Sequence, residues 1–233
     1  MSTSTPQPTP SINLYTYFRS SCSARLRIAL ELKSIPYTST PINLLKNEQS
    51  GPRNTSVNPS ATVPTLIITY PNSPEREPVK ITQSLAALEY LDEAFPNLPR
   101  LLPSPSQPET RALVRTLANI VSCDIQPVTN LRILKRVAPF GVDRAAWSKE
   151  LIEDGLYAYE SIVKESAGVY SVGDEITVAD LCLIPAIWGA ERVGVDLTVF
   201  PTVKRIAEAL EGVEAVRKGH WRTQEDTPEE LRV

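Results

Sequence analysis

The N-terminal part of the chain switches between two hydrophobic spacings, one typical of strands and one typical of helices. Strands are predicted where strand-forming residues dominate, at residues 12–18, 37–43, 63–70 and 79–82. Apolar residues at helical spacing follow the first strand, at residues 26–32, and the last strand, from Ser84 to just before Pro96. The predicted order is therefore a βαβ unit followed by a β-hairpin and a helix.

The pattern changes after residue 96. Five prolines, at positions 96, 99, 103, 105 and 108, predict an extended linker. Beyond it, helical spacing recurs at residues 113–125, 147–163, 178–188 and 203–210, with no convincing strand. We predict an α/β N-terminal thioredoxin-like domain plus an all-α C-terminal domain. The boundaries are a tail at residues 1–10, the first domain at 11–97, the proline-rich linker at 98–108 and the helical domain at 109–233.

Composition narrows the class of protein. The 233 residues carry 24 Lys and Arg against 27 Asp and Glu, a net charge of -3, so no nucleic acid or membrane partner is expected. The N-terminus lacks the pattern of a signal peptide, and no apolar run is long enough to span a bilayer. Three distant cysteines suit a reducing compartment, and we expect a cytoplasmic protein. A single histidine, His220, argues against a histidine metal site or a Ser-His-Asp triad, and no metal is expected.

Hydroxyl groups gather where the first strand ends and the first helix begins. Ser20, Ser21, Cys22 and Ser23 lie at this predicted helix N-terminus, whose unpaired N–H groups favour an anion. The alternative is that one serine caps the helix and Cys22 fills core space. The cluster alone leaves both interpretations open.

Two further places precede a strand or a helix on the same small sheet. Val63-Pro64 comes before the third strand, where a cis peptide would turn the Val63 backbone toward a peptide-like ligand. Gln83-Ser84 opens the next helix and offers an amide, a hydroxyl and free N–H groups to a carboxylate. An ordinary trans proline and a simple helix cap are the alternatives. All three places are expected to converge on one end of the domain.

The segment Tyr17-Phe18-Arg19-Ser20-Ser21-Cys22-Ser23, followed by Arg25-Leu26-Arg27-Ile28-Ala29-Leu30, resembles the signature of zeta-class glutathione transferases. The resemblance extends along nearly the whole chain, through Asn58-Pro59, Val63-Pro64-Thr65-Leu66, Gln83-Ser84-Leu85-Ala86, Ile125-Gln126-Pro127, Ala179-Asp180-Leu181-Cys182 and Asp226-Thr227-Pro228. It implies the glutathione transferase fold, glutathione as cofactor and a homodimer.

The resemblance also implies roles for individual residues. Ser20 would be the principal hydroxyl facing the glutathione sulfur, with Ser21 and Cys22 beside it as the other catalytic residues. The implied glutathione-binding residues are Ser20, Ser21, Cys22, Ser23, Ala24, Arg25, Gln49, Val63, Pro64, Gln83, Ser84, Gln126, Asn130, Leu131 and Arg132. Arg192 would bind the small anionic substrate, although a surface ion pair is its simpler explanation.

The activity implied by the resemblance is glutathione-dependent cis–trans isomerisation of maleylacetoacetate to fumarylacetoacetate, in tyrosine and phenylalanine catabolism. One alternative is a transferase that conjugates or dehalogenates small α-halo acids. A second is a non-catalytic glutathione-binding interaction module. A glutaredoxin-like oxidoreductase using Cys22 is disfavoured, because no second cysteine lies at Cys-x-x-Cys spacing.

Several residues have structural explanations or depart from the family pattern. Thr177 and Asp180 fit a capping box, so Asp180 is assigned to folding and not to catalysis. Cys123 and Cys182 have apolar neighbours and are predicted to lie in the core. Ala24 stands where relatives often carry a large ring, and residues 70–80 predict a long surface loop.

Overall fold

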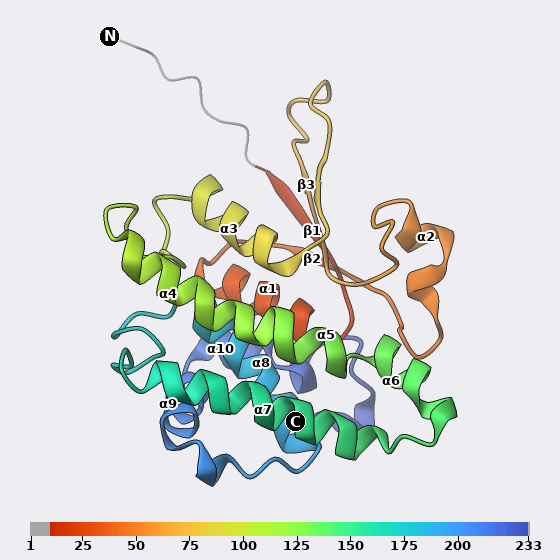
Figure 1. Cartoon of the computed structure of the whole chain (residues 1–233). Helices are drawn as coiled ribbons and strands as arrows, with labels where there is room; N and C mark the ends of the chain where they lie inside the picture. The colour runs from red at the N-terminus through yellow and green to blue at the C-terminus, as the bar shows by residue number, and fades with distance from the viewer. Residues whose placement is uncertain (1–9, 233) are drawn as a thin grey trace.

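The computed structural model describes residues 10–232, and the predicted tail at residues 1–10 lies almost entirely outside that range. The N-terminal half contains a mixed sheet in the order β2-β1-β3-β4, in which β1 pairs parallel with β2 and antiparallel with β3. The strands are β1 (Ser11–Thr16), β2 (Thr38–Pro41), β3 (Thr65–Thr69) and β4 (Val79–Ile81), and the helices are α1 (Ser21–Leu32), α2 (Pro52–Thr55) and α3 (Ser84–Ala94). This arrangement confirms the predicted thioredoxin-like fold (Figure 1).

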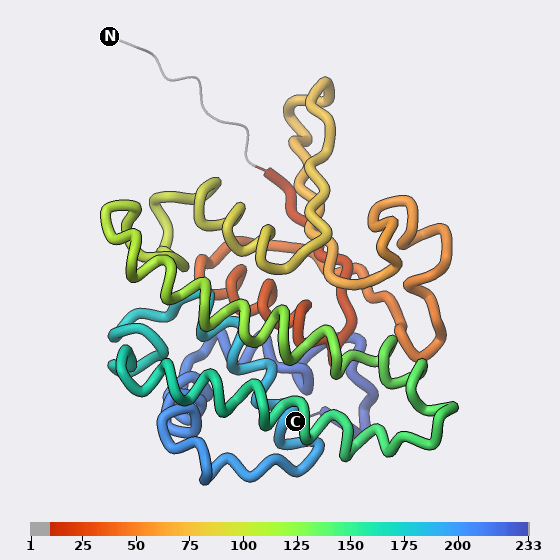
Figure 2. Tube along the Cα trace, viewed as in Figure 1, coloured from red at the N-terminus to blue at the C-terminus, as the bar shows by residue number. Residues whose placement is uncertain are grey.

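Helices make up the rest of the chain, as predicted, and Figure 2 follows their path from green to blue. They are α4 (Pro108–Asn119), α5 (Gln126–Thr129), α6 (Leu131–Val137), α7 (Arg144–Val163), α8 (Val178–Arg192), α9 (Pro201–Glu211) and α10 (Glu214–Gly219), with a π-helical segment at Ile120–Ile125 after α4. Patterning missed α2, α5, α6 and α10, because elements of four to seven residues are too short to show a helical period.

Helix α1 lies at the centre of the molecule. Every residue from position 23 to position 30 is buried, because α3, α8 and α10 pack around this helix. A helix covered on all sides has no polar stripe to keep in water. One hydrophobic cluster therefore joins the two predicted domains, with Leu26 and Leu30 from the first and Leu181 and Ile184 from the second.

The proline-rich segment 98–108 is packed and is not the extended spacer predicted from its composition. Leu101 and Leu102 expose only 1% and 3% of their surface, since both side chains join the shared core. The buried Lys33 donates to the Pro99 carbonyl at 2.7 Å, and Asp92 accepts from the Leu101 N–H at 2.6 Å. Proline content indicated where the chain crosses between domains, but apolar residues between the prolines decide how it packs.

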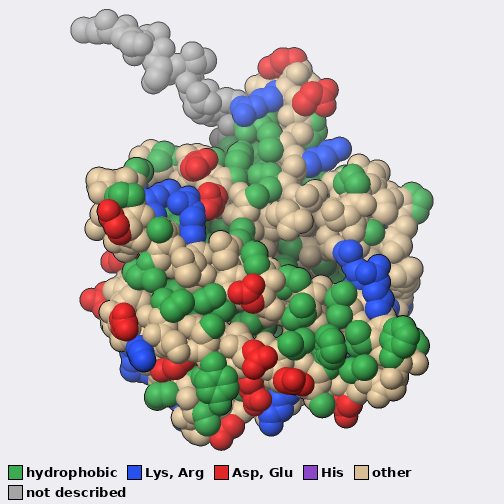
Figure 3. All heavy atoms as spheres, viewed as in Figure 1, with side chains coloured by type: hydrophobic (Ala, Val, Ile, Leu, Met, Phe, Trp, Pro, Cys, Tyr) green, Lys and Arg blue, Asp and Glu red, His purple; other side chains and the backbone are tan. Residues whose placement is uncertain are grey.

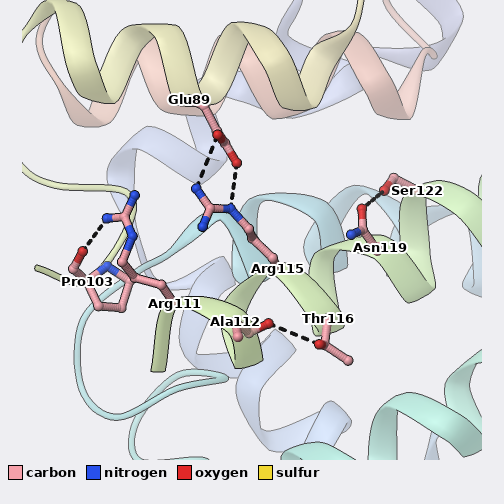
Figure 4. A network of polar contacts seen from close by, with 8 residues as sticks. All are labelled: Glu89, Pro103, Arg111, Ala112, Arg115, Thr116, Asn119 and Ser122. Atoms are coloured by element: carbon pink, nitrogen blue, oxygen red, sulfur yellow. Dashed lines mark hydrogen bonds and ion pairs between the residues drawn. The ribbon is translucent and has the colours of Figure 1, made fainter. Parts of the chain in front are cut away.

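Polar contacts across the domain boundary support this junction. Figure 4 shows Arg115 of α4 reaching Glu89 of α3, with a shortest nitrogen–oxygen distance of 2.8 Å. In the same view Arg111 donates to the Pro103 carbonyl. Glu89 and Arg115 are both partly exposed, so this pair contributes at most about 1 kcal/mol to stability.

The start of α8, two cysteines and the connection between β3 and β4 were also predicted from the sequence. The capping box at the start of α8 is confirmed, since Asp180 accepts from the Thr177 N–H at 2.8 Å. Cys182 is buried as predicted, but the prediction for Cys123 is wrong, because its side chain is exposed in the π-helical segment. The connection between β3 and β4 projects from the molecule as a long loop, as expected (Figures 1 and 2).

The surface agrees with the charge balance of the sequence. On the face that Figure 3 shows, Lys and Arg side chains stand in small separate groups among acidic and apolar ones. Among the residues described, no helix has the length and apolar content needed to cross a membrane.

Candidate functional site

The site is built around the turn that joins β1 to α1. The Ser20 N–H donates to the Tyr17 carbonyl at 2.9 Å, and the Ser20 hydroxyl oxygen accepts from the Ser23 N–H at 3.2 Å. Ser20 is therefore the N-cap of α1. A hydroxyl that accepts through its oxygen still has its own proton to donate. The capping role and an anion-binding role are thus compatible in one side chain.

The first turn of α1 presents further donors beside Ser20. Ser21 and Cys22 are both partly exposed, and within residues 10–232 their N–H groups have no acceptor. These groups carry the positive end of the helix dipole. The turn therefore offers a hydroxyl and two N–H groups to a negative ligand.

The next three residues lie beneath this surface. Ser23 and Ala24 expose no more than 1% of their surface, and the fully buried Arg25 donates to the Ser84 hydroxyl oxygen at 3.1 Å. Two nitrogens of Arg25 have no partner in the part of the chain that the structure describes. We therefore assign these residues a supporting position behind the site and not a contact with the ligand.

The segment before β3 supplies a second part of the site. The Val63–Pro64 peptide bond is cis, one of the two alternatives considered from the sequence. Just before it, the side-chain amides of Asn54 and Asn58 donate to the Thr62 carbonyl at 3.2 and 3.0 Å. Over residues 10–232 the backbone of Val63 makes no hydrogen bond, so its N–H and C=O remain available.

Gln49, which is implied as a glutathione-binding residue, lies in the short turn Glu48–Ser50 before α2. Its amide nitrogen donates to Asn47 at 2.8 Å, while its amide oxygen is buried and has no donor in the described structure. The rest of the Gln49 side chain is partly exposed in this short 3-10 turn.

The start of α3 forms a third part. Gln83 is the N-cap of this helix, is exposed, and makes no capping bond with its side chain. Ser84 follows and is held from behind by Arg25. In the part of the chain that the structure describes, the first N–H groups of α3 and the Gln83 amide have no partner and can bind a carboxylate.

Four predicted glutathione-binding residues lie in the helical domain, and the side chains of two of them already make hydrogen bonds within the protein. Asn130 caps α6 by accepting from the Ile133 N–H at 3.1 Å, and its amide nitrogen donates to Pro127. Arg132 reaches across the domain boundary and donates to the Ser60 carbonyl at 3.3 Å. Gln126 and Leu131 begin α5 and α6 and are partly exposed.

Two arginines, Arg19 in the β1–α1 turn and Arg192 at the end of α8, interact electrostatically. Arg192 is the last residue of α8 and is exposed as a whole residue, while burial of its guanidinium and the charge of Arg19 lower its pKa. Burial raises the pKa of Tyr17, while the positive charges of Arg19 and Arg192 act in the opposite direction, so both guanidinium groups act on the same side chain. Among the described residues neither arginine has an acidic partner, so the predicted alternative of a surface ion pair for Arg192 is wrong.

Arg19 was not singled out from the sequence. Its guanidinium lies 5.3 Å from the Phe18 ring and 5.9 Å from the Trp221 ring. Its position directly before Ser20 was the available signal, but only the fold brings Arg192 to it from a distant helix. Like charges held together without counter-ions favour a ligand with more than one negative charge.

Among the described residues, the thioredoxin-like sheet carries donors without partners at two helix starts and an unpaired backbone segment between them. This arrangement suits a small peptide-like anion. The all-helical domain adds Arg192 to that site, and the first domain adds Arg19. The first part matches the family model described as the N-terminal domain of glutathione S-transferase, over residues 19–94, and the second matches its C-terminal domain, over residues 141–218. The chain belongs to the glutathione S-transferase family, within the zeta class.

Individual relatives are similar over nearly their full length. A protein of Emericella nidulans named maleylacetoacetate isomerase is 71% identical over 222 residues, covering 95% of this chain and 96% of that protein. A Mus musculus protein of the same name is 43% identical, with 94% and 97% covered. The crystal structure of maleylacetoacetate isomerase from Anaeromyxobacter dehalogenans with bound GSH has a TM-score of 0.85 at 34% identity, covering 95% of this chain and all of that one.

Proposed function

We propose that this chain is a glutathione-dependent isomerase that converts maleylacetoacetate to fumarylacetoacetate. Relatives named for that activity at 71% and 43% identity support the proposal. The observation that carries it is the state of Ser20, whose oxygen holds the helix cap while its proton is free, in a turn flanked by Arg19 and Arg192.

The residues present fit glutathione along its length. Gln83, Ser84 and the start of α3 suit the γ-glutamyl carboxylate, and the unpaired Val63 backbone suits the cysteinyl amide. We assign the partly exposed Gln49, in the short 3-10 turn before α2, to the glycyl end. Ser20 and the first turn of α1 then face the sulfur.

Glutathione, when bound, supplies a thiolate that can add reversibly to a conjugated double bond, which rotates while it is single. The protein's part is to keep the sulfur charged. A thiol with a pKa of about 8.5 is only about 3% ionised at pH 7, and lowering that pKa to about 6.5 requires about 2.7 kcal/mol. A hydrogen bond from Ser20 to an anion contributes about 1.5 to 3 kcal/mol, and the start of α1 about 0.3 to 1 kcal/mol. These groups are sufficient without a histidine.

Arg19 and Arg192 suit the second substrate, a dicarboxylate. Each guanidinium can bind a carboxylate through two parallel hydrogen bonds, which an ammonium group cannot do. A doubly charged ligand also relieves the repulsion between the two cations. We assign the two arginines to orienting the substrate so that its double bond lies next to the sulfur.

We also propose that the chain acts as a homodimer in the cytoplasm. The implied family assembly and the absence of a membrane-spanning helix among the described residues support this setting. Light scattering of the purified protein would give twice the chain mass of 25.7 kDa for a dimer. A monomer mass would contradict the assembly without affecting the chemistry proposed above.

The role of the site can be tested on bound glutathione without any second substrate. Thiolate absorbs in the ultraviolet, so a pH titration of the complex measures the pKa of the bound thiol. We expect a value about two units below that of free glutathione. A bound thiol with the pKa of free glutathione would remove the basis of the proposed activity.

A further inference from the structure

The C-terminal segment, residues 220–232, lies against the β1–α1 turn. Its Trp221 ring is 6.4 Å from the Phe18 ring, centroid to centroid. A small apolar cluster separate from the main core contains Tyr17, Phe18, Ile42 and Val63, and Trp221 and Leu231 pack against it. The end of the chain therefore forms part of the wall behind the site.

Asp226 in this segment contacts the turn directly. Its carboxylate accepts from the Phe18 N–H at 2.8 Å, across 208 positions of sequence. That N–H belongs to the same peptide group as the Tyr17 carbonyl, which accepts from the Ser20 N–H at 2.9 Å. Two hydrogen bonds and one rigid peptide plane thus connect Asp226 to Ser20.

Arg27 holds the same peptide group from its other side. The fully buried guanidinium donates to the Phe18 carbonyl at 3.0 Å, the Thr16 hydroxyl at 3.0 Å and the Tyr17 carbonyl at 3.4 Å. The peptide between residues 17 and 18 therefore has its carbonyl toward a cation and its N–H toward an anion. That orientation aligns the peptide dipole with both charges, so rotating the peptide group is unfavourable in this environment.

Close packing brings the C-terminal part of the chain to this place. Arg27 also donates to the Gly219 carbonyl at 3.1 Å, at the end of α10. A side-chain carbon added at Gly219 would lie 2.5 Å from the Ile28 side chain and 3.1 Å from its backbone nitrogen. Only glycine therefore permits α10 to approach α1 closely enough for this bond.

The segment around Asp226 is itself well braced. Thr227 exposes only 2% of its surface, and its hydroxyl donates to the Trp221 carbonyl. Arg232 donates to the carbonyls of Thr227 and Glu225, at 2.9 and 2.7 Å. The Asp226 carboxylate is thus presented by a folded loop.

We infer that Asp226 is a positioning residue for the reaction, which acts through the Tyr17–Phe18 peptide group, together with Arg27, to aim the Ser20 hydroxyl at the thiolate. This inference rests on the proposed function, because it takes Ser20 as the group that stabilises the sulfur. The C-terminal segment then contributes to the active site without contacting the ligand. The expected consequence is a change in the thiol pKa of bound glutathione when Asp226 is altered.

The test compares Asp226→Ala and Asp226→Asn with Glu225→Ala, which removes the neighbouring, exposed carboxylate. With Asp226→Ala we expect the bound thiol pKa to rise, the acid limb of the kcat/KM profile to move to higher pH, and kcat/KM at pH 7 to fall about tenfold. Asp226→Asn retains an uncharged acceptor, so about a threefold loss is expected. Glu225→Ala should match the wild type.

The outcomes separate this inference from the proposed function. If both Asp226 variants lower the melting temperature but leave the thiol pKa of bound glutathione at the wild-type value, Asp226 is purely structural and the inference fails. If Asp226→Ala does not fold, Asp226→Asn decides by the same criterion. A wild-type protein that lowers the thiol pKa but isomerises nothing would refute the proposed function while the pKa comparison still tests Asp226. A wild-type protein that leaves the thiol pKa unchanged would overturn both.

Discussion

At the scale of single residues, Ser20 and Ser21 have the same side chain but differ in the hydrogen bonds that they make. Ser20 caps α1 through its oxygen and is tied to Tyr17 through its N–H. Ser21 occupies the first helical position, and its hydroxyl makes no hydrogen bond in the described part of the chain. The proposed thiolate interaction therefore depends mainly on Ser20.

Replacing the two serines in turn tests this distinction. We expect Ser20→Ala to reduce kcat/KM by about 10- to 150-fold, the equivalent of one hydrogen bond to a charged group. Ser20→Thr keeps the hydroxyl and should retain more activity, whereas Ser21→Ala should lose less than about threefold. Steady-state kinetics on the three variants would measure this. Equal losses at both positions would mean that the assignment of the hydroxyl is wrong.

His220 provides a pH-dependent prediction. Its ring packs at 4.4 Å from Trp188, and burial together with the charges of Arg222 and Arg27 lowers its pKa to about 4. The unfolded chain binds this proton near pH 6.5, so the unfolded state is favoured progressively as the pH falls from about 6.5 to about 4. Above about pH 6.5 the imidazole ring is neutral in both the folded and the unfolded state, so this loss of stability is absent.

Thermal melts across that pH range can isolate the effect. We expect the melting temperature of the wild type to fall between pH 6.5 and pH 4 more steeply than that of His220→Gln, which does not titrate. The variant loses aromatic packing and starts lower, so the slope is the relevant quantity. Parallel slopes would show that His220 is as easily protonated in the folded protein as in the unfolded chain.

At the scale of elements, the start of α8 is the capping box expected from its sequence. Asp180 is buried and accepts from the N–H of Ser171 and from the N–H and hydroxyl of Thr177. Asp180→Ala leaves these donors without a partner, so we expect a loss of about 2 to 4 kcal/mol in unfolding free energy. Glu175→Ala, an exposed acidic residue nearby, should change stability by less than about 0.5 kcal/mol. Urea denaturation would measure both, and a small effect at Asp180 would contradict its folding role.

How far the sequence predicts each element depends on whether its signal is local. The starts of α1, α3 and α8 were predicted because capping residues and a change of hydrophobic period lie within a few positions of one another. The burial of Cys123 was predicted wrongly, because Ile120, Val121 and Ile125 of the same segment fill the core while Cys123 is exposed. Asp226 was noted only as part of a family pattern, since its partner Phe18 is far away in the sequence.

At the scale of the whole molecule, the site depends on both ends of the chain. The N-terminal domain contributes Ser20 and Val63, α8 contributes Arg192, and the C-terminal segment holds the turn that carries Ser20. The shared core fixes these parts relative to one another. Their combination supports a specific reaction, in which a thiolate is stabilised on one side and a dicarboxylate is held on the other.

The most direct measurement mixes the purified protein with maleylacetoacetate, or its analogue maleylacetone, and follows the loss of the cis isomer by ultraviolet absorbance with and without glutathione. We expect turnover that requires glutathione but does not consume it, and that decreases strongly in Arg192→Ala. Isomerisation at the same rate without glutathione, or none in its presence, would contradict the account.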